Sequence, residues 1–480
     1  MNEKPGKSML FGSVSIASIV VLVFGSMVPS ILMATSPDKD NEMNIIKAWD
    51  IIVPDDYKTL SEAVSSAKTG DQIFVRAGRY NSGSGNYFNN PLTIKTPGIT
   101  VCGEDKNTTI IDGRHQSTVI YIYADSVTIQ GFTIINNGLN SSLLYVASDN
   151  NIIKDNIFKT YDVYDGIEYG AKFFDSRYNI FSNNSVSGAD YGLNLANADY
   201  NTFSYNEIQE TDYAVDVDGI LMINFSKPIS DKLYSDQCSN NRFIGNIIQN
   251  NRVGLSLTSS DDNIILNNTF SSNNMNGLTL SSCKNNVVKS NTFIKDGFDL
   301  YGSEIDHYIH DISGNTVNDK PIYYLYDKED YTVPSDAGQI IIVSCSDITV
   351  ENIVISETPV GVIVAFSSDI YIKNCEFSYN VRGVYLYFSS DCYISNNNFI
   401  KNNRNAYFMC LGLAQVRSNS WSRNYWEDKI ELRVGLFRSH REKIHGRFIL
   451  KRNIGNSDRL RLGIRTRNID RHPARNPYEI

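Results

Sequence analysis

Single apolar residues recur at a nearly constant interval along the middle of the chain, with small and polar residues at fixed distances from each. The interval is mostly 22 to 24 residues, is 28 once, and widens between residues 208 and 248 and between 293 and 355. The apolar positions are Ile134, Phe158, Val186, Ile208, Ile248, Phe270, Phe293, Ile355, Phe377 and Phe399. A period this regular indicates one structural unit repeated along an axis.

Two further columns accompany the apolar one. The residue ten positions before each apolar position is small: Ala124, Ser148, Ser176, Ala198, Cys238, Ser260, Cys283, Cys345, Ser367 and Ser389. Asparagine stands seven and two positions before it in most repeats, as in Asn241 and Asn246 before Ile248. Coils of about 22 residues, with short strands and asparagine at the corners, are the rungs of a parallel β-helix. Asparagine is expected there because it tolerates the left-handed conformation of a sharp corner, and because stacked amides can hydrogen-bond from one coil to the next. We therefore predict an all-β fold, a right-handed parallel β-helix with a helical N-terminal cap.

Other repeat folds fit this pattern less well. The leucine framework of leucine-rich repeats is missing, and a β-propeller blade needs roughly 40 or more residues. Cys238, Cys283 and Cys345 occupy the small column, which favours packing over metal binding. The seven cysteines form no CxxC pair, so neither a zinc site nor a dense disulfide framework is indicated.

The two ends differ from this repetitive middle. Lys4 and Lys7 precede an uncharged, mostly apolar stretch over residues 9–33, the order seen in signal peptides and long enough to span a bilayer. We predict a signal peptide or membrane anchor over 1–36, and we leave the two alternatives open. We expect the β-helix over 37–420, with its cap at about 55–80 and an insertion at about 298–345. A basic segment follows over 421–480.

Composition and charge limit the classes of partner that the chain is expected to bind. The chain of 480 residues holds 53 asparagines and carries a formal net charge of −9. Residues 421–480 carry +8 and the rest −17. The basic end could bind an acidic polymer or lipid headgroups, but a solvated face or pairing with the acidic body is the favoured expectation. This balance gives no case for nucleic acid. The apolar N-terminal stretch points to export and, if it is retained, to contact with a membrane.

Three stretches resemble a known family. Residues 56–80 resemble the cap helix and first strand of pectin-lyase-like β-helices, and residues 263–280 resemble their repeats. The segment from Gly314 to Tyr324, running on to Gly338, and the closing residues 424–428 and 472–478 resemble the NosD family, although Arg471 stands where tryptophan is usual. NosD proteins are exported β-helix proteins named after a copper-enzyme maturation factor. The resemblance implies the fold, and only the resemblance implies copper.

Copper delivery would need soft or imidazole ligands at one place. His307 and His310, in the predicted insertion, are the nearest candidates, and Met409 with Cys410 is a second. A structural role for His310 is the favoured alternative.

Cleavage of a polysaccharide would instead need paired carboxylates. If the strand after each repeat's glycine alternates inward and outward, Glu168 and Asp216 share an outward column about 9.5 Å apart, and Asp218 lies on the same face. This spacing is at the edge of the range for inverting glycosidases. Since exposed carboxylates are common and the motifs of known pectin-degrading enzymes are missing, we do not predict an enzyme.

Exposed tyrosines favour binding. The same alternation places Tyr385 and Tyr387 outward, with Tyr371 and Tyr393 on another strand. Stacked tyrosines can hold sugar rings, or they can simply stabilise the stacking of coils. The sequence therefore predicts a non-catalytic envelope or cell-surface protein that binds polysaccharide or another extended ligand, with copper-site maturation and polysaccharide cleavage as alternatives.

Overall fold

The computed structural model describes residues 49–82, 91–161, 166–218, 238–410, 417–427, 432–434, 437–439, 442–454, 458–470, 473–474 and 476–480. Of Asp218 and of the strands between residues 432 and 469, only the backbone is described. The predicted signal peptide or anchor over 1–36 lies outside these residues. Within them, no helix is long and apolar enough to cross a membrane.

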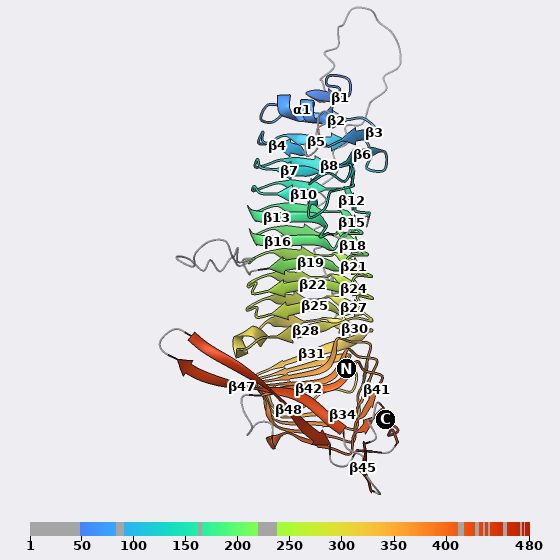
Figure 1. Ribbon diagram of the computed structural model, residues 1–480, viewed down its shortest axis with the longest axis vertical. Helices are drawn as coiled ribbons and strands as arrows, with labels where there is room; N and C mark the ends of the chain where they lie inside the picture. The colour runs from blue at the N-terminus through green and yellow to red at the C-terminus, as the bar shows by residue number, and fades with distance from the viewer. Residues whose placement is uncertain are drawn as a thin grey trace, which may run out of the picture. The chain divides into compact units, whose positions relative to one another are not determined.

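The first part of the chain forms coils that follow one another in chain order (Figure 1). Each complete coil contributes one strand to each of three parallel sheets, called sheets I, II and III below. Short parallel strands joined in this way form a right-handed parallel β-helix, as the 22-residue period predicts.

Sheet I has eleven strands. They are β1 (Ile51–Val53), β2 (Gln72–Val75), β5 (Thr100–Gly103), β8 (Thr128–Gln130), β11 (Ile152–Lys154), β14 (Ile180–Ser182), β17 (Thr202–Ser204), β20 (Arg242–Ile244), β23 (Ile264–Leu266), β26 (Val287–Lys289) and β29 (Asp311–Ser313). Sheet II has nine strands. They are β4 (Leu92–Ile94), β7 (Ile120–Ile122), β10 (Ser142–Val146), β13 (Tyr169–Arg177), β16 (Tyr191–Asp199), β19 (Tyr213–Asp218), β22 (Val253–Thr258), β25 (Asn276–Ser281) and β28 (Phe298–Tyr301).

Sheet III completes each coil. Its strands are β3 (Gly78–Asn81), β6 (Thr109–Asp112), β9 (Thr133–Ile135), β12 (Ile157–Lys159), β15 (Ser185–Ser187), β18 (Glu207–Gln209), β21 (Ile247–Gln249), β24 (Thr269–Ser271), β27 (Thr292–Ile294) and β30 (Thr316–Val317). The first coils are capped by α1 (Leu60–Ser66), where Thr59 accepts a hydrogen bond from the backbone N–H of Glu62. Helix α1 buries Leu60, Ala63 and Val64, as expected for a helical cap.

The asparagine columns form buried hydrogen-bonded ladders. The backbone N–H and side-chain amide of Asn179 both donate to Asn201 Oδ1, at 2.9 and 3.0 Å. The residues at the first corner are Asn151, Asn179, Asn201, Asn241, Asn263 and Asn286, and those at the second are Asn156, Asn184, Asn206, Asn246, Asn268, Asn291 and Asn315. These ladders satisfy backbone donors that each corner would otherwise bury without a partner.

One detail of the corner prediction was wrong. The left-handed residue is the one before each ladder asparagine, for example Asn240 (φ 60°) before Asn241 and Tyr205 (φ 56°) before Asn206. The ladder asparagines are not among the residues with positive φ. Asparagine is needed here for its amide rather than for conformational tolerance. The preceding residue supplies the sharp turn.

The small column is confirmed as packing. Cys238, Cys283 and Cys345 are buried, and each lies within hydrogen-bonding range of backbone carbonyls, as Cys283 Sγ does of Leu257 O at 3.3 Å. Burial raises the pKa of the Cys283 thiol to about 12, so this thiol stays protonated at neutral pH.

A second stack of coils follows the first, with its own three sheets. Sheet IV holds β31 (Lys320–Tyr326), β33 (Gln339–Val343), β36 (Val360–Ala365), β39 (Arg382–Tyr387) and β42 (Arg404–Cys410). Sheet V holds β32 (Glu329–Thr332), β34 (Ser346–Glu351), β37 (Ser368–Lys373), β40 (Ser390–Ser395) and β43 (Ser420–Ser422), and sheet VI holds β35 (Val354–Ser356), β38 (Glu376–Ser378), β41 (Asn398–Ile400) and β44 (Tyr425–Trp426).

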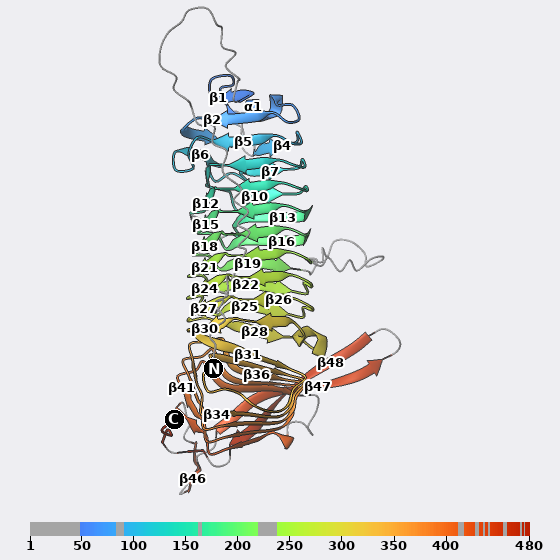
Figure 2. The same cartoon turned by 180° about the vertical axis from the view of Figure 1, so that it is seen from behind.

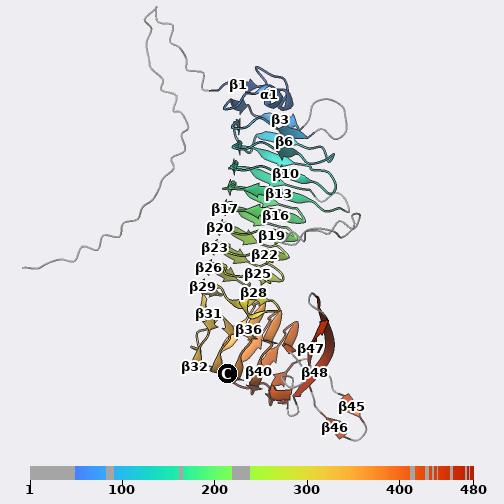
Figure 3. The same ribbon diagram turned by 90° about the vertical axis from the view of Figure 1, so that its left-hand side faces the viewer.

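The two stacks meet within residues 298–345, the predicted insertion. These residues contain β28 to β33 and a 3-10 helix over Ile305–Tyr308. Strand β31 pairs antiparallel with β30, which changes the chain direction between the stacks. Figure 3 shows β31 and β36 of the second stack below β28 and β29 of the first. Each stack has its own hydrophobic core.

Sheet IV is buried on both faces. One face, with Ile342 and Leu386, belongs to the core of the second stack. The other face, with Ile341, Ile363 and Tyr385, belongs to the core of the first stack and covers its last coil (Figure 2). Tyr324 Oη donates to the carbonyl of Tyr308 at 2.7 Å across this junction. The continuous apolar runs of β33 and β36 are typical of such doubly buried strands.

The basic C-terminal segment adds an antiparallel pair of strands, β47 (Glu442–Ile454) and β48 (Asp458–Asp470), of which β47 continues sheet IV beside β42. A short pair, β45 (Leu432–Val434) and β46 (Phe437–Ser439), precedes it. Asp470, which is buried, accepts hydrogen bonds from Asn424 and from Trp426 Nε1 at 3.1 Å.

Candidate functional site

One column of side chains runs along the outer face of sheet II. Strand register places these residues side by side on successive coils, while the residues on either side of each point into the core. The column, called the outer column below, is Thr93, Tyr121, Tyr145, Lys172, Asn194, Asp216, Ser256, Thr279 and Asp299. Eight strand spacings of about 4.8 Å make it about 38 Å long.

The register corrects the predicted carboxylate column. Lys172, not Glu168, occupies the position beside Asn194. Glu168 precedes β13, is 5% exposed, and its backbone N–H donates to Asp190 Oδ2 at 2.7 Å, while the neighbouring Ile167, expected in the core, is 46% exposed. The longer coil before Val186 shifts the alignment by four residues, so Glu168 and Asp216 do not form the expected pair.

Asp216 remains in the outer column. Asn194 Nδ2 donates to its Oδ2 at 3.2 Å. Asp218 lies two residues further along the same strand, where its backbone is in register with Ala196 and Thr258. A catalytic role for Glu168, Asp216 or Asp218 stays untested.

An exposed aromatic cluster, missed in the sequence, covers the upper part of this face. Tyr121 stacks on Tyr123 with ring centroids 5.4 Å apart, and Tyr145 lies 5.3 Å from Tyr121 and 6.4 Å from Phe174. Tyr123 is 49% exposed and Phe174 41% exposed. These four residues are called the aromatic platform. The alternation of tyrosine with a buried Ile122 was the signal that could have revealed it.

A second row of tyrosines runs beside the outer column. Tyr169, Tyr191 and Tyr213 stack on successive coils with centroids 5.2 Å apart. Lys172 lies over the Tyr169 ring at 4.8 Å, and Arg252 lies over the Tyr213 ring at 4.7 Å. The face of sheet II thus combines flat aromatic surfaces with cations, amides and a carboxylate, which suits polyhydroxylated ligands.

The predicted tyrosines of the second stack have different surroundings. Tyr385 and Tyr387 do point away from the second core, but they are only 5% and 6% exposed, so the expectation of an open face there was wrong. The cause is the end of the first stack, which packs on that face: Tyr308 lies 5.5 Å from Tyr387, ring to ring. Tyr371 and Tyr393 stack 5.1 Å apart on sheet V, and Tyr393 is exposed.

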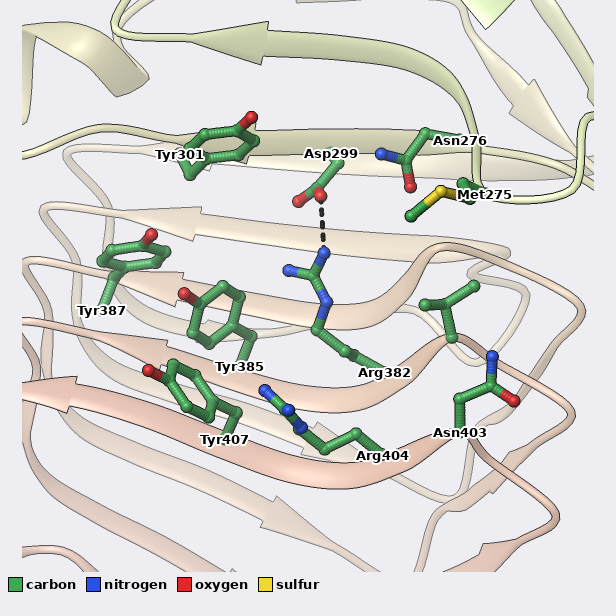
Figure 4. Close-up of a pocket in the computed structure, with 11 residues that line it drawn as sticks. Met275, Asn276, Asp299, Tyr301, Arg382, Tyr385, Tyr387, Asn403, Arg404 and Tyr407 are labelled. Atoms are coloured by element: carbon green, nitrogen blue, oxygen red, sulfur yellow. Dashed lines mark hydrogen bonds and ion pairs between the residues drawn. The ribbon is translucent and has the colours of Figure 1, made fainter. Parts of the chain in front are cut away.

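A cavity of about 590 Å³ opens where the two stacks meet (Figure 4). Asp299 and Tyr301 of β28 line one side, and Arg382, Tyr385 and Tyr387 of β39 with Arg404 and Tyr407 of β42 line the other. Arg382 donates to Asp299 Oδ2 at 2.9 Å. The two guanidinium groups lie over the rings of Tyr385 and Tyr407, at 5.2 and 5.0 Å. This space is called the junction cavity.

Burial fixes the protonation of the tyrosines in this wall. It raises the pKa of Tyr387 to about 12, and burial raises the pKa of Tyr385 well above its ordinary value. Both phenols therefore remain neutral hydrogen-bonding groups at physiological pH.

The histidines proposed for copper do not fit a copper site. His310 Nδ1 accepts the backbone N–H of Asn286 at 3.2 Å, and Nε2 lies 3.2 Å from the carbonyl of His307. His310 thus ends the first asparagine ladder, with both ring nitrogens occupied. His307 Nδ1 accepts the N–H of Ser303 at 3.2 Å. In the part of the chain that the structure describes, no group of three His, Cys, Asp or Glu residues could hold a metal ion.

This placement makes His310 a source of acid sensitivity. Burial lowers its pKa from 6.5 to about 4, so the folded state holds the neutral ring and its contribution to stability is lost as pH falls from 6.5 toward 4. His310→Asn continues the ladder with a side chain that does not titrate. Between pH 7.5 and pH 5, we expect the difference in unfolding free energy between this variant and the native chain to shift by about 2 kcal/mol in favour of the variant. Denaturant unfolding at the two pH values measures this.

His310→Ala serves as the contrast. Because alanine cannot accept the N–H of Asn286, this variant should lose stability at both pH values. If His310→Asn showed the same decline between pH 7.5 and 5 as the native chain, the assignment of acid sensitivity to His310 would be wrong.

Comparison with solved structures finds β-helix proteins of low sequence identity. The catalytic domain of a GH87 α-1,3-glucanase in complex with nigerose is 15% identical over 81% of this chain and 71% of that chain, with a TM-score of 0.38. The A-module of the Azotobacter vinelandii mannuronan C-5 epimerase AlgE4 is 15% identical over 74% and 86% of the two chains, with a TM-score of 0.33. A pectin methylesterase in complex with a hexasaccharide is 16% identical over 47% and 79%, with a TM-score of 0.31. No curated protein matches the chain.

A family model confirms the resemblance seen in the sequence. It is described as periplasmic copper-binding protein (NosD), and it matches residues 64–227, 221–333 and 324–446. These matches cover most of the chain, including both stacks of coils. The protein therefore belongs to the NosD family of exported, periplasmic β-helix proteins.

Proposed function

We propose that this NosD-family protein is a non-catalytic envelope protein that binds a polysaccharide along the outer column of sheet II. The observation that carries the proposal is the aromatic platform at one end of a continuous polar column. Sugar rings present apolar faces that pack on aromatic rings and hydroxyl groups that hydrogen-bond to polar side chains. Sheet II offers both on one face.

The repetition of the site suits a repetitive ligand. Successive coils place Lys172, Asn194 and Asp216 at one strand spacing from each other, so an extended polymer meets a polar side chain at each of these coils. A small compact ligand would use only a part of this column. An exported protein meets such polymers in the cell envelope.

Truncating the exposed rings tests this function. We expect Tyr123→Ala and Phe174→Ala each to weaken binding of the recognised glycan by about 10-fold, because each removes a stacking surface worth about 1 to 1.5 kcal/mol. Both side chains are exposed, so the fold should be unaffected. A glycan array identifies the ligand, and calorimetry measures the affinity.

Tyr178→Ala is the matched control. Tyr178 is an exposed tyrosine stacked on Tyr200 at 5.3 Å, and it follows β13 rather than lying within sheet II. It should leave affinity unchanged. An array without any bound glycan would contradict the proposal, and release of reducing ends that Asp216→Asn abolishes would replace it with a polysaccharide hydrolase.

A further inference from the structure

The outer column leads directly into the junction cavity. Thr279 is in register with Asp299, and Asp299 lines the cavity at the last strand of sheet II. Asn276, at the start of β25, lines it as well. A polymer that follows the outer column toward β28 therefore reaches the space between the two stacks (Figures 1 and 4).

The charges of the cavity do not cancel. Asp299 and Arg382 form an ion pair, and the Asp299 side chain is only 1% exposed. Arg404 is exposed, lies over the Tyr407 ring, and has no acidic partner within 4 Å among the described residues. One carboxylate thus faces two guanidinium groups, although the whole chain carries −9. Arg404 has its fork of donors left for a ligand.

One carboxylate oxygen in the cavity wall also lacks a hydrogen-bond donor. Asp299 Oδ2 accepts from Arg382, while Oδ1 is buried with no partner in the described part of the chain. A buried carboxylate oxygen without a donor is costly, so a hydroxyl group arriving from the cavity would be favoured there. Figure 4 shows this carboxylate beside Tyr301, with the guanidinium group of Arg382 below it.

We propose that the junction cavity binds an acidic sugar residue of the polysaccharide, with Arg404 pairing with its carboxylate or sulfate group and Asp299 Oδ1 accepting one of its hydroxyls. Tyr407 and Tyr301 provide the adjoining ring surfaces. This inference rests on the proposed polysaccharide-binding function and names its ligand class. It makes Arg404 the residue that selects acidic over neutral polymers.

The test compares Arg404→Gln with the native chain on three probes: a polyuronate, the same polymer with its carboxyl groups reduced to alcohols, and a sulfated glycan. We expect Arg404→Gln to bind the polyuronate about 10- to 100-fold more weakly, because it loses a charge-assisted pair. Its affinity for the reduced polymer should equal that of the native chain. Stronger binding of the sulfated glycan than of the polyuronate would identify sulfate as the anionic group.

Lys159→Gln is the control for net charge. Like Arg404→Gln, it removes one cation that lies over a tyrosine ring, here that of Tyr161. Lys159 lies on sheet III, away from the cavity. It should leave all three affinities unchanged. The inference is overturned if the native chain binds the reduced polymer as well as the polyuronate, or if Arg404→Gln retains native affinity.

The two proposals fail in different ways. If Tyr123→Ala weakens binding and Arg404→Gln does not, polysaccharide binding stands and the acidic subsite is wrong. If none of the probes or arrayed glycans binds, the proposed function itself is wrong, and the acidic subsite falls with it.

Discussion

Replacing Asn246 with alanine is expected to lower the free energy of unfolding by about 4 kcal/mol. The Asn246 amide connects three coils: its Oδ1 accepts the backbone N–H and the side-chain amide of Asn206, both at 3.0 Å. Its Nδ2 donates to Phe203 O and to Asn268 Oδ1, both at 2.9 Å. Alanine removes all four contacts and leaves the backbone N–H of Asn206 without its acceptor, in a region where both asparagines are buried.

Denaturant unfolding of the native chain and the variant measures the loss, and amide hydrogen exchange locates it. Exchange should accelerate first at Asn206 and its neighbours, because each coil contacts mainly the coils next to it. Asn107→Ala is the control, since Asn107 is an exposed asparagine outside the ladders and its replacement should change stability by less than about 0.5 kcal/mol. A loss of under about 1 kcal/mol for Asn246→Ala would mean that the ladders contribute little.

The repeating fold could be predicted because its signals are local. The asparagine ladders need the same residue type at the same corner of every coil, so the sequence alone identifies Asn246 and Asn268 as members of one column. The small column is constrained in the same way by close packing at a corner. Contacts between neighbouring coils repeat at the sequence period, and an alignment by period finds them.

The junction between the stacks could not be predicted in this way. The burial of Tyr385 and Tyr387 depends on the end of the first stack, which lies about 80 residues earlier in the chain, as the Asp299–Arg382 pair shows. Alternation along β39 gives the direction of these side chains but not what covers them. The continuous apolar run of β36 was a local sign that both faces of sheet IV are buried.

The candidate site was predicted only in part. Asp216 lies in a surface column, as expected, but the column's other members depend on coil lengths, and one longer coil replaces Glu168 with Lys172. The aromatic platform combines residues of three coils whose tyrosines belong to no single motif. His310 was correctly given a structural alternative, and its two ring contacts now explain why.

Asp296 ends a third buried ladder, which runs through Thr211, Asn251 and Asn273 on successive coils. Asn273 donates to its Oδ2 through the backbone N–H at 3.1 Å and through Nδ2 at 2.6 Å, and Gly297 N–H donates to Oδ1 at 3.2 Å. The carboxyl is buried beside a cavity that Lys295 and Glu357 also line. Burial raises the pKa of Asp296 from 3.8 to about 7, against the opposing effect of these hydrogen bonds.

The raised pKa sets the direction of a pH effect. The folded state holds the proton of Asp296 more tightly than the unfolded state does. The resulting contribution to the free energy of unfolding is fully present below pH 3.8 and is lost as pH rises to about 7. Asparagine keeps the acceptor for Asn273 and carries no charge. We therefore expect Asp296→Asn to be about 4 kcal/mol more stable than the native chain at pH 8, and nearly equal to it at pH 4.

Denaturant unfolding of both proteins from pH 4 to pH 8 measures this difference. Glu357→Gln is the control, because Glu357 is exposed and lies in the same cavity but outside the ladder, so its removal should not reproduce the rise. Equal slopes of stability against pH for the native chain and Asp296→Asn would show that the carboxyl titrates alike in the folded and unfolded states. A difference that grows only above about pH 4 would instead establish that this ladder ends on a buried acid whose ionisation destabilises the folded chain.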